Sequence, residues 1–134
     1  MLYKKDKGRF VTLRHFLSIP FLFLPLFPLI LLDIVFEIYH HVCFPLLGIP
    51  LVKRKNYIVF DRAWLSYLNI FEKIYCAYCS YANGLLAYTV KIASETEKYW
   101  CGIKHKLFPG YVQPWHHEDF AEYDNKEEFE KKYL

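Results

Sequence analysis

Residues 75–105, which read YCAYCSYANGLLAYTVKIASETEKYWCGIKH, decide how we expect the chain to fold. They open with a Cys-x-x-Cys pair, Cys76 and Cys79, and close with Cys101 and His105, which are spaced as i and i+4 on a helix. Two thiolates from one turn and a Cys–His pair from one helix face suit a closed tetrahedral site for Zn²⁺ or Fe²⁺. The residues between the pairs have helical periodicity, so a turn followed by a helix would bring the pairs together. We therefore expect these four side chains to bind one zinc or iron ion.

The cysteines also leave other interpretations open. Cys76 and Cys79 could act as a thiol redox pair, or the cysteines could form disulfides in an oxidising compartment. Buried thiols can also serve only as small apolar side chains. Cys43 stands alone in an apolar run, and we expect it to be inert. The metal site is favoured because soft ligands occur in pairs, and a closed four-ligand site would be structural, without catalysis at the ion.

Glu97 is a lesser ligand candidate. It precedes Cys101 and His105 at i, i+4 and i+8, so it could orient His105 or replace a ligand. The simpler interpretation is a partly exposed acid that pairs with Lys98 or Lys104.

His116 and His117 are two further lesser candidates, placed after a loop that contains proline. Adjacent histidines point in different directions on a regular element, so we expect at most one of them to join a given site. One could complete the cysteine site or form a second site with Asp33 and Glu37. The simpler interpretation is that both are ordinary polar loop residues.

The composition predicts contact with a membrane or a partner protein. The chain of 134 residues is 54% hydrophobic and 20% aromatic, more than a soluble domain of this size can bury. Residues 1–55 carry eight Lys and Arg against three acids, whereas residues 56–134 carry nine against eleven. A basic portion that flanks apolar sequence fits anionic lipid headgroups, and no signature of nucleic-acid binding accompanies it.

The chain opens with a basic leader, whose cations are Lys4, Lys5, Lys7, Arg9 and Arg14. Residues 16–32 follow without a charge. We expect this run to be a membrane anchor and not a signal peptide, because no small-x-small cleavage site comes after it. Pro20, Pro25 and Pro28 interrupt the run and predict a kinked helix.

The topology of the anchor depends on the second basic cluster, residues 53–55 (KRK). The apolar stretch before it, residues 42–52, is too short to span a bilayer. Basic clusters at both ends favour a re-entrant hairpin or a helix lying at the interface, with both clusters in the cytoplasm. A single span and a soluble subunit covered by a partner stay open. A cytoplasmic module would keep the cysteines reduced, whereas a single span would favour disulfides.

Asp33, Glu37, His40 and His41 form a second cluster at the end of the anchor, on one helix face. Ionisable groups at membrane depth often mark a functional site. The spacing of Glu37 and His40 is that of ligands in carboxylate-bridged di-iron bundles, but it occurs only once here. Solvated side chains at the headgroup level are the simpler interpretation. One alternative is contact with a lipid headgroup or a partner. The other is a metal-dependent membrane enzyme that uses Asp33, Glu37 and His40, with His116 or His117 as a further candidate, on a lipid-like or quinone-like substrate.

Local patterns predict the remaining elements. We expect a short strand or an extended connector at residues 56–60, Asp61 as an N-cap, and an amphipathic helix over residues 62–75. Asn83-Gly84 predicts a turn and the start of the next helix. Residues 106–114 are expected to form a loop and residues 124–134 a short helix with charge pairs at i,i+4.

Three stretches resemble motifs of a group of small bacterial membrane proteins of unknown function. They are YCAYCSYANG at 75–84, YWCGIKH at 99–105 and DIVFEIYHHVCFPLLGIPLVKR at 33–54, so the resemblance extends over about residues 30–120. It implies a bacterial inner-membrane setting and no particular activity.

Together these patterns predict a mostly α protein with a membrane anchor region in residues 1–55 and a helical metal-binding module in residues 56–134. The expected function is a membrane-attached protein whose structural Cys₃His site presents a surface to a protein partner. We expect it at the inner membrane, with most of the module in the cytoplasm. The metal-dependent membrane enzyme and the thiol redox protein are the alternatives.

Overall fold

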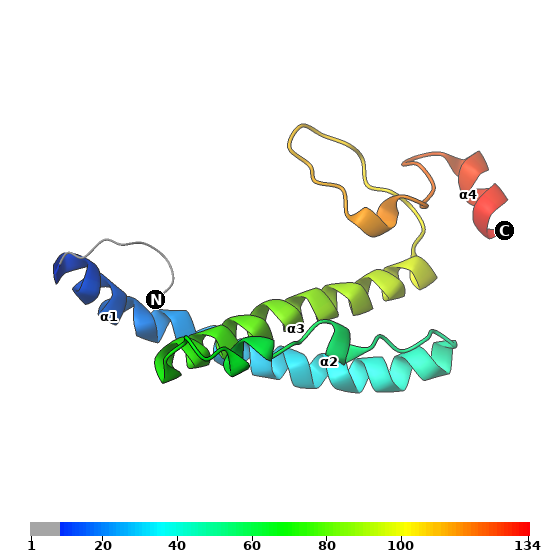
Figure 1. Ribbon diagram of the computed structural model, residues 1–134. Helices are drawn as coiled ribbons and strands as arrows, with labels where there is room; N and C mark the ends of the chain where they lie inside the picture. The colour runs from blue at the N-terminus through cyan, green and yellow to red at the C-terminus, as the bar shows by residue number, and fades with distance from the viewer. Residues whose placement is uncertain (1–8) are drawn as a thin grey trace. The chain divides into compact units, whose positions relative to one another are not determined.

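The computed structural model describes residues 9–134, with side chains from Leu13 onward, so the leader cations Lys4, Lys5 and Lys7 lie outside the described residues. The described chain is mostly helical and contains no strand, only an isolated bridge between Ile103 and Ala121. Its elements are α1 (Arg9–Phe23), α2 (Leu26–Leu47), η1 (Arg54–Asn56), η2 (Asp61–Trp64), α3 (Ile70–Trp100), η3 (Trp115–His117) and α4 (Lys126–Tyr133) (Figure 1). The chain divides into two compact units within α3, after Thr89.

The apolar N-terminal portion is a broken helix, as predicted. A turn at Leu24 and Pro25 separates α1 from α2, and Pro28 lies in the first turn of α2, where a missing backbone donor is tolerated. Residues Leu13–Leu47 are long and apolar enough to cross a membrane, by length and composition alone, and only 6% of an apolar 18-residue segment within this stretch is buried. The helix continues well beyond the predicted residues 16–32.

Residues 42–52 do not form a separate element, because α2 extends to Leu47. Gly48 then ends the helix in the left-handed conformation, at φ 70°, and its N–H donates to the carbonyls of Phe44 and Pro45. This is the usual glycine cap of a helix C-terminus.

In the first unit, α2 and α3 run parallel with a return segment, residues 48–69, packed against both (Figure 1). Contacts advance in the same direction along the two helices. The Tyr81 hydroxyl of α3 donates to Asp33 of α2 at 2.8 Å, and the His40 ring lies 5.8 Å from that of Tyr88 further along both helices. The core of this unit contains Leu29, Phe44, Leu68, Leu85 and Tyr88.

The structure differs from several local predictions in the return segment and α3. Of the two expectations for residues 56–60, the strand is wrong, and residues 58–60 form a connector without secondary structure. Asp61 begins only a short 3-10 turn. The long helix starts at Ile70, where Asn69 and Glu72 cap each other: each side chain accepts the other residue's backbone N–H, both at 2.9 Å. This Asn-x-x-Glu signal is visible in the sequence.

Asn83-Gly84 does not form the predicted turn, because α3 continues through it. A Cβ at Gly84 would lie 2.5 Å from the backbone oxygen of Tyr57 and 3.0 Å from the Cα of Ile58. The glycine therefore permits close packing of the return segment on the helix, and its role is not to break the helix.

The second unit, Val90–Leu134, consists of the end of α3 followed by extended loops, η3 and α4. The Ala121 N–H donates to the Gly102 carbonyl at 2.7 Å, and the Lys104 N–H donates to the Ala121 carbonyl at 2.9 Å. The expected loop at 106–114 is confirmed. The expected C-terminal helix is α4, whose N-cap Asn125 accepts the Glu128 N–H.

Candidate metal centre

The four ligands predicted from spacing are not brought together. Cys76 and Cys79 lie in α3, and Cys101 directly follows its last residue. A helix rises about 1.5 Å per residue, so the distance from Cys79 to Cys101 along this element is about 30 Å. The predicted fold-back fails because the helix does not break at Asn83-Gly84. All four cysteines of the chain are free thiols.

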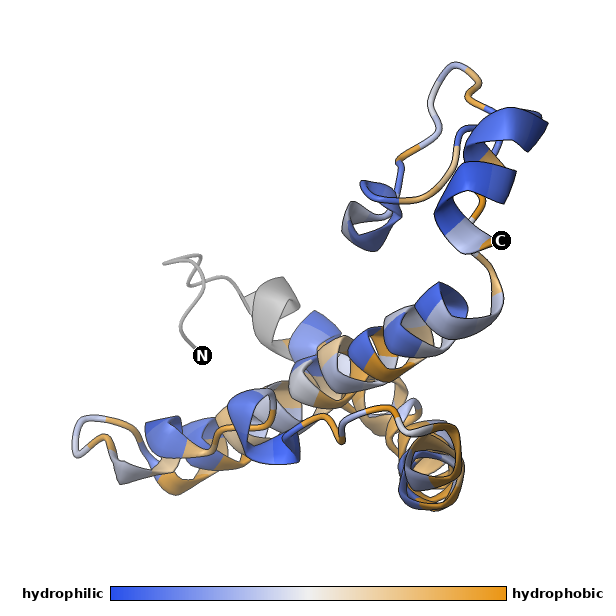
Figure 2. Ribbon diagram, turned by 90° about the vertical axis from the view of Figure 1, so that its right-hand side faces the viewer, coloured by the Kyte–Doolittle hydropathy of each residue, from blue (hydrophilic) through white to orange (hydrophobic). Residues whose placement is uncertain are grey.

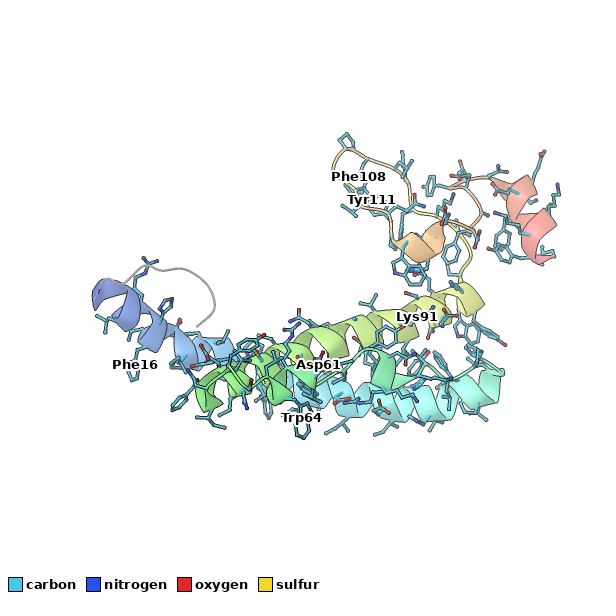
Figure 3. All side chains as sticks on the ribbon, viewed as in Figure 1. Phe16, Asp61, Trp64, Lys91, Phe108 and Tyr111 are labelled. Carbon is cyan, nitrogen blue, oxygen red and sulfur yellow. The ribbon has the colours of Figure 1, made fainter. Side chains whose placement is uncertain are left out.

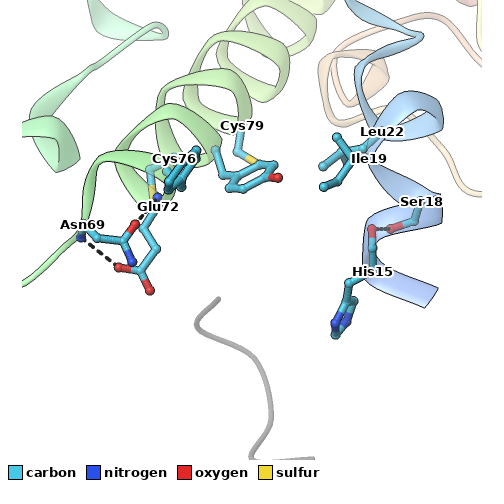
Figure 4. A pocket seen from close by; sticks show the side chains of 10 residues that line it. His15, Ser18, Ile19, Leu22, Asn69, Glu72, Cys76 and Cys79 are labelled. Atoms are coloured by element: carbon cyan, nitrogen blue, oxygen red, sulfur yellow. Dashed lines mark hydrogen bonds between the residues drawn. The ribbon is translucent and has the colours of Figure 1, made fainter. Parts of the chain in front are cut away.

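Cys76 and Cys79 instead border a cavity of about 330 Å³ between α1 and the start of α3. Half of its other lining residues are apolar or aromatic and half are polar: Ile19, Leu22, Phe71 and Tyr75 against His15, Ser18, Asn69 and Glu72 (Figure 4). Cys76 is buried and Cys79 is exposed. Neither thiol belongs to a cluster of possible metal ligands among the described residues.

The second unit brings together Glu97, His116 and His117, three lesser candidates from the sequence. The Nε2 of His116 lies 2.6 Å from Oε2 of Glu97, and the Nε2 of His117 lies 3.0 Å from Oε1. Both histidine side chains are buried, with 7% and 1% of their surface exposed, whereas that of Glu97 is 33% exposed. One possible ligand atom from each residue lies within 4.8 Å of the other two.

The expectation that at most one histidine would join a site is wrong, because η3 turns tightly. Its N-cap Pro114 is extended, and the His117 N–H donates back to the Pro114 carbonyl at 3.1 Å. The two imidazole rings lie 4.6 Å apart at 84°, so each reaches a different oxygen of the same carboxylate. The His117 ring also stacks on Phe120 at 4.7 Å.

Two lysine side chains of α3 contact the ring of Trp115, the first residue of η3. The Lys91 ammonium lies 4.9 Å and the Lys98 ammonium 5.4 Å from the centre of the indole ring (Figure 3 labels Lys91). Cation–π contacts of this kind favour one position of the turn relative to the end of α3.

Glu97 provides the negative charge of the cluster. Burial disfavours its charged form, but hydrogen bonds from His116 and His117 and their proximity outweigh this effect and hold the pKa of Glu97 below its usual value. Because an ionised carboxylate only accepts, each ring presents an N–H at Nε2. The Nδ1 atoms of both rings are buried without a hydrogen-bond partner.

The expected partners of Glu97 lie elsewhere. Lys98 pairs with Glu95 at 3.4 Å, and Lys104 pairs with Glu122 at 2.5 Å. His105 is not a ligand of the cluster, but its ring lies 5.5 Å from that of His117.

The cluster at the end of the anchor is organised by Arg54, which the sequence analysis did not single out. Its guanidinium donates to both carboxylate oxygens of Asp33, at 2.7 Å for the bond to Oδ2, and to Oε1 of Glu37 at 2.9 Å. The Tyr81 hydroxyl donates to Asp33 at 2.8 Å. Burial and the bond to Asp33 raise the pKa of Tyr81 to about 12, so it remains a donor at neutral pH.

Both ring nitrogens of His40 also have partners within the protein. It is 1% exposed; its Nε2 accepts the Val52 N–H at 2.9 Å, and its Nδ1 lies 3.1 Å from the Tyr88 hydroxyl. A neutral imidazole has one lone-pair nitrogen, and here the backbone of Val52 uses it. Glu37, His40 and His41 also lie within ligand distance of one another, but His40 has no free electron pair for a metal. The cluster is therefore best explained as a structural one, which joins α2 to the return segment and to α3.

Comparison of the chain with models of protein families, with curated proteins and with solved structures gives no match.

Proposed function

We propose that this chain is a membrane-attached metal-binding protein in which Glu97, His116 and His117 hold one divalent ion. The observation that carries the proposal is the convergence of three ligand atoms within 4.8 Å, two of them on buried rings. Two imidazoles and a carboxylate suit Zn²⁺ with one position left for water. The same set suits Fe²⁺ with open positions, so zinc or iron remains the expected ion.

The donor set fits a metal ion, and its surroundings predict a moderate affinity. Histidine ligands usually donate their second ring N–H to a carboxylate or carbonyl, and loss of such a partner weakens binding by about 10–100-fold. Here neither Nδ1 has a partner. The ion must also displace the Nε2 protons that face Glu97, so binding should release protons.

We propose that the ion stabilises the second unit, Val90–Leu134, which has a small hydrophobic core. The buried hydrophobic residues of Val90–Leu134 are only Ile92, Phe120 and Ala121. In units of fewer than about 70 residues a single core rarely supplies more than about 3–5 kcal/mol, and a metal is one common supplement. An ion on Glu97, His116 and His117 would tie η3 to the end of α3.

Fastening η3 would also hold the loop before it, where a protein partner could bind. Leu107, Phe108 and Val112 on this loop are 68%, 62% and 86% exposed. Exposed apolar side chains grouped on one ordered loop are typical of a binding surface.

The test is calorimetric titration of the detergent-purified full chain, stripped of metal, with Zn²⁺ and, anaerobically, with Fe²⁺. We expect one equivalent to bind to the wild-type chain. His116→Ala and Glu97→Gln should each weaken binding at least about 100-fold, because a three-ligand site loses a ligand.

His41→Ala is the matched control, since His41 is an exposed histidine of the other cluster. It should leave affinity unchanged. Unchanged affinity in both His116→Ala and Glu97→Gln, with native circular dichroism, would refute the site.

A further inference from the structure

One face of α2 is apolar and uncovered. Phe27, Leu31, Ile34, Ile38, Val42 and Leu46 recur at helical spacing, and each is at least 53% exposed. We call these six residues the apolar stripe. Figure 2 shows α2 as a predominantly hydrophobic helix. On α1, Phe16 and Phe21 are 70% and 73% exposed, and Phe16 points away from the ribbon in Figure 3. A surface of this size on a soluble monomer needs a cover.

The opposite face of α2 is covered by protein. Asp33, Glu37 and His40 lie there, bound to Arg54 and to the Val52 N–H of the return segment, and Phe44 is fully buried. The helix therefore has one face for protein and one face for a different, apolar environment.

The return segment restricts how α2 can meet a membrane. It lies beside Asp33, Glu37 and His40, in the middle of the helix, and apart from two short 3-10 turns it is not helical. Lys53 and Lys55 on it are exposed. If α2 crossed the bilayer, the helix would extend about 33 Å, close to the hydrocarbon thickness, and this segment would lie near the midplane. Irregular backbone and exposed ammonium groups are not stable in that position.

We infer that α2 does not cross the membrane but lies in the plane of one leaflet, with the apolar stripe in lipid and the return segment and α3 on the aqueous side. The charge of the first unit favours an anionic bilayer as the cover: residues 1–89 carry ten Lys and Arg against five acids, whereas residues 90–134 carry seven against nine. This inference rests on the membrane attachment in the proposed function, but not on the metal ion.

The experiment uses the full chain with different epitope tags at its two ends, in sealed bacterial membrane vesicles of known orientation. An in-plane helix places both tags and the tryptic sites at Lys53 and Lys55 on the same side, so protease digests all of them or none. Tags on opposite sides would overturn the inference while leaving membrane attachment intact. A chain found entirely in the soluble fraction would overturn both the attachment and the inference.

The stripe itself is tested by binding the purified chain to vesicles of phosphatidylcholine and phosphatidylglycerol. Ile34→Glu and Ile38→Glu should each lower the partition coefficient at least about tenfold, because each removes an exposed aliphatic side chain that the lipid would bury. Val59→Glu changes a residue outside the stripe that is 48% exposed and should have little effect. Equal partitioning of all three variants would overturn the inference. So would a dimer in detergent that Ile34→Glu dissociates without changing lipid binding, because a second copy would then cover the stripe.

Discussion

His40 and the pair His116–His117 differ in what their ring nitrogens bind. His40 uses both nitrogens within the protein, so it acts as a fixed connector between α2, the return segment and α3. His116 and His117 direct one nitrogen each at a single carboxylate and leave the other without a partner. Only the second arrangement offers ligand atoms that an ion can take over.

Glu97 should make the stability of the metal-free second unit depend on pH. Its pKa in the folded chain is below the usual value of 4.5, so its stabilising contribution is present above about pH 4.5 and is lost as the pH falls below that value. Hydrogen exchange in residues 90–134 should therefore be faster at pH 3.5 than at pH 6, after correction for the intrinsic rate. Glu97→Gln should reduce this difference; an equal difference in wild type and variant would contradict the assignment.

Arg54 should stabilise the first unit more than its exposed neighbours do. Arg54→Met removes charged hydrogen bonds to Asp33 and Glu37 and should cost about 2 kcal/mol. Lys55→Met makes the same change of charge at the exposed neighbouring residue and should stay within about 0.5 kcal/mol. Thermal unfolding in mild detergent, followed by circular dichroism, gives the comparison. Equal effects of the two substitutions would mean that the ion pairs of Arg54 do not stabilise the first unit.

At the scale of elements, the continuity of α3 from Ile70 to Trp100 determines which of the predicted ligands lie close together. The spacing of Cys-x-x-Cys and Cys-x₃-His predicts a metal site, and the two pairs can meet only if the chain turns between them, as Asn83-Gly84 suggests. That dipeptide normally indicates a turn, and only the approach of Tyr57 reveals its other use. A contact between residues so far apart in sequence leaves no local pattern. By contrast, the kinked anchor, the C-terminal helix and the Asn69–Glu72 capping box all depend on neighbours in sequence, and patterns for them are present there.

Gly84→Ala tests this account of α3. Alanine favours a helix interior over glycine by about 1 kcal/mol, so an unconstrained position would become more stable. Here the Cβ would lie 2.5 Å from a backbone oxygen, and the return segment would have to move. We expect a lower unfolding temperature. Asn83→Ala, at the adjacent exposed position, should change it little. Stabilisation by Gly84→Ala would contradict the close packing.

At the scale of the whole molecule, the sequence predicted the mostly helical class and the long apolar N-terminal helix, because both follow from composition and periodicity. It also named Glu97, His116 and His117, but only as lesser candidates. Their convergence depends on the loop that returns η3 to the end of α3, and neither spacing nor periodicity encodes that return. Arg54 was predicted only as part of a basic cluster, since its acidic partners lie on another element.

The central claim is the metal at Glu97, His116 and His117, and elemental analysis tests it most directly. The full chain would be purified in detergent beside a His116→Ala/His117→Ala variant and a Cys76→Ser/Cys101→Ser variant. We predict about one equivalent of zinc or iron in the wild type and in the cysteine variant, and none in the histidine variant. Metal that survives in the histidine variant and disappears in the cysteine variant would contradict the claim and return the site to the cysteines.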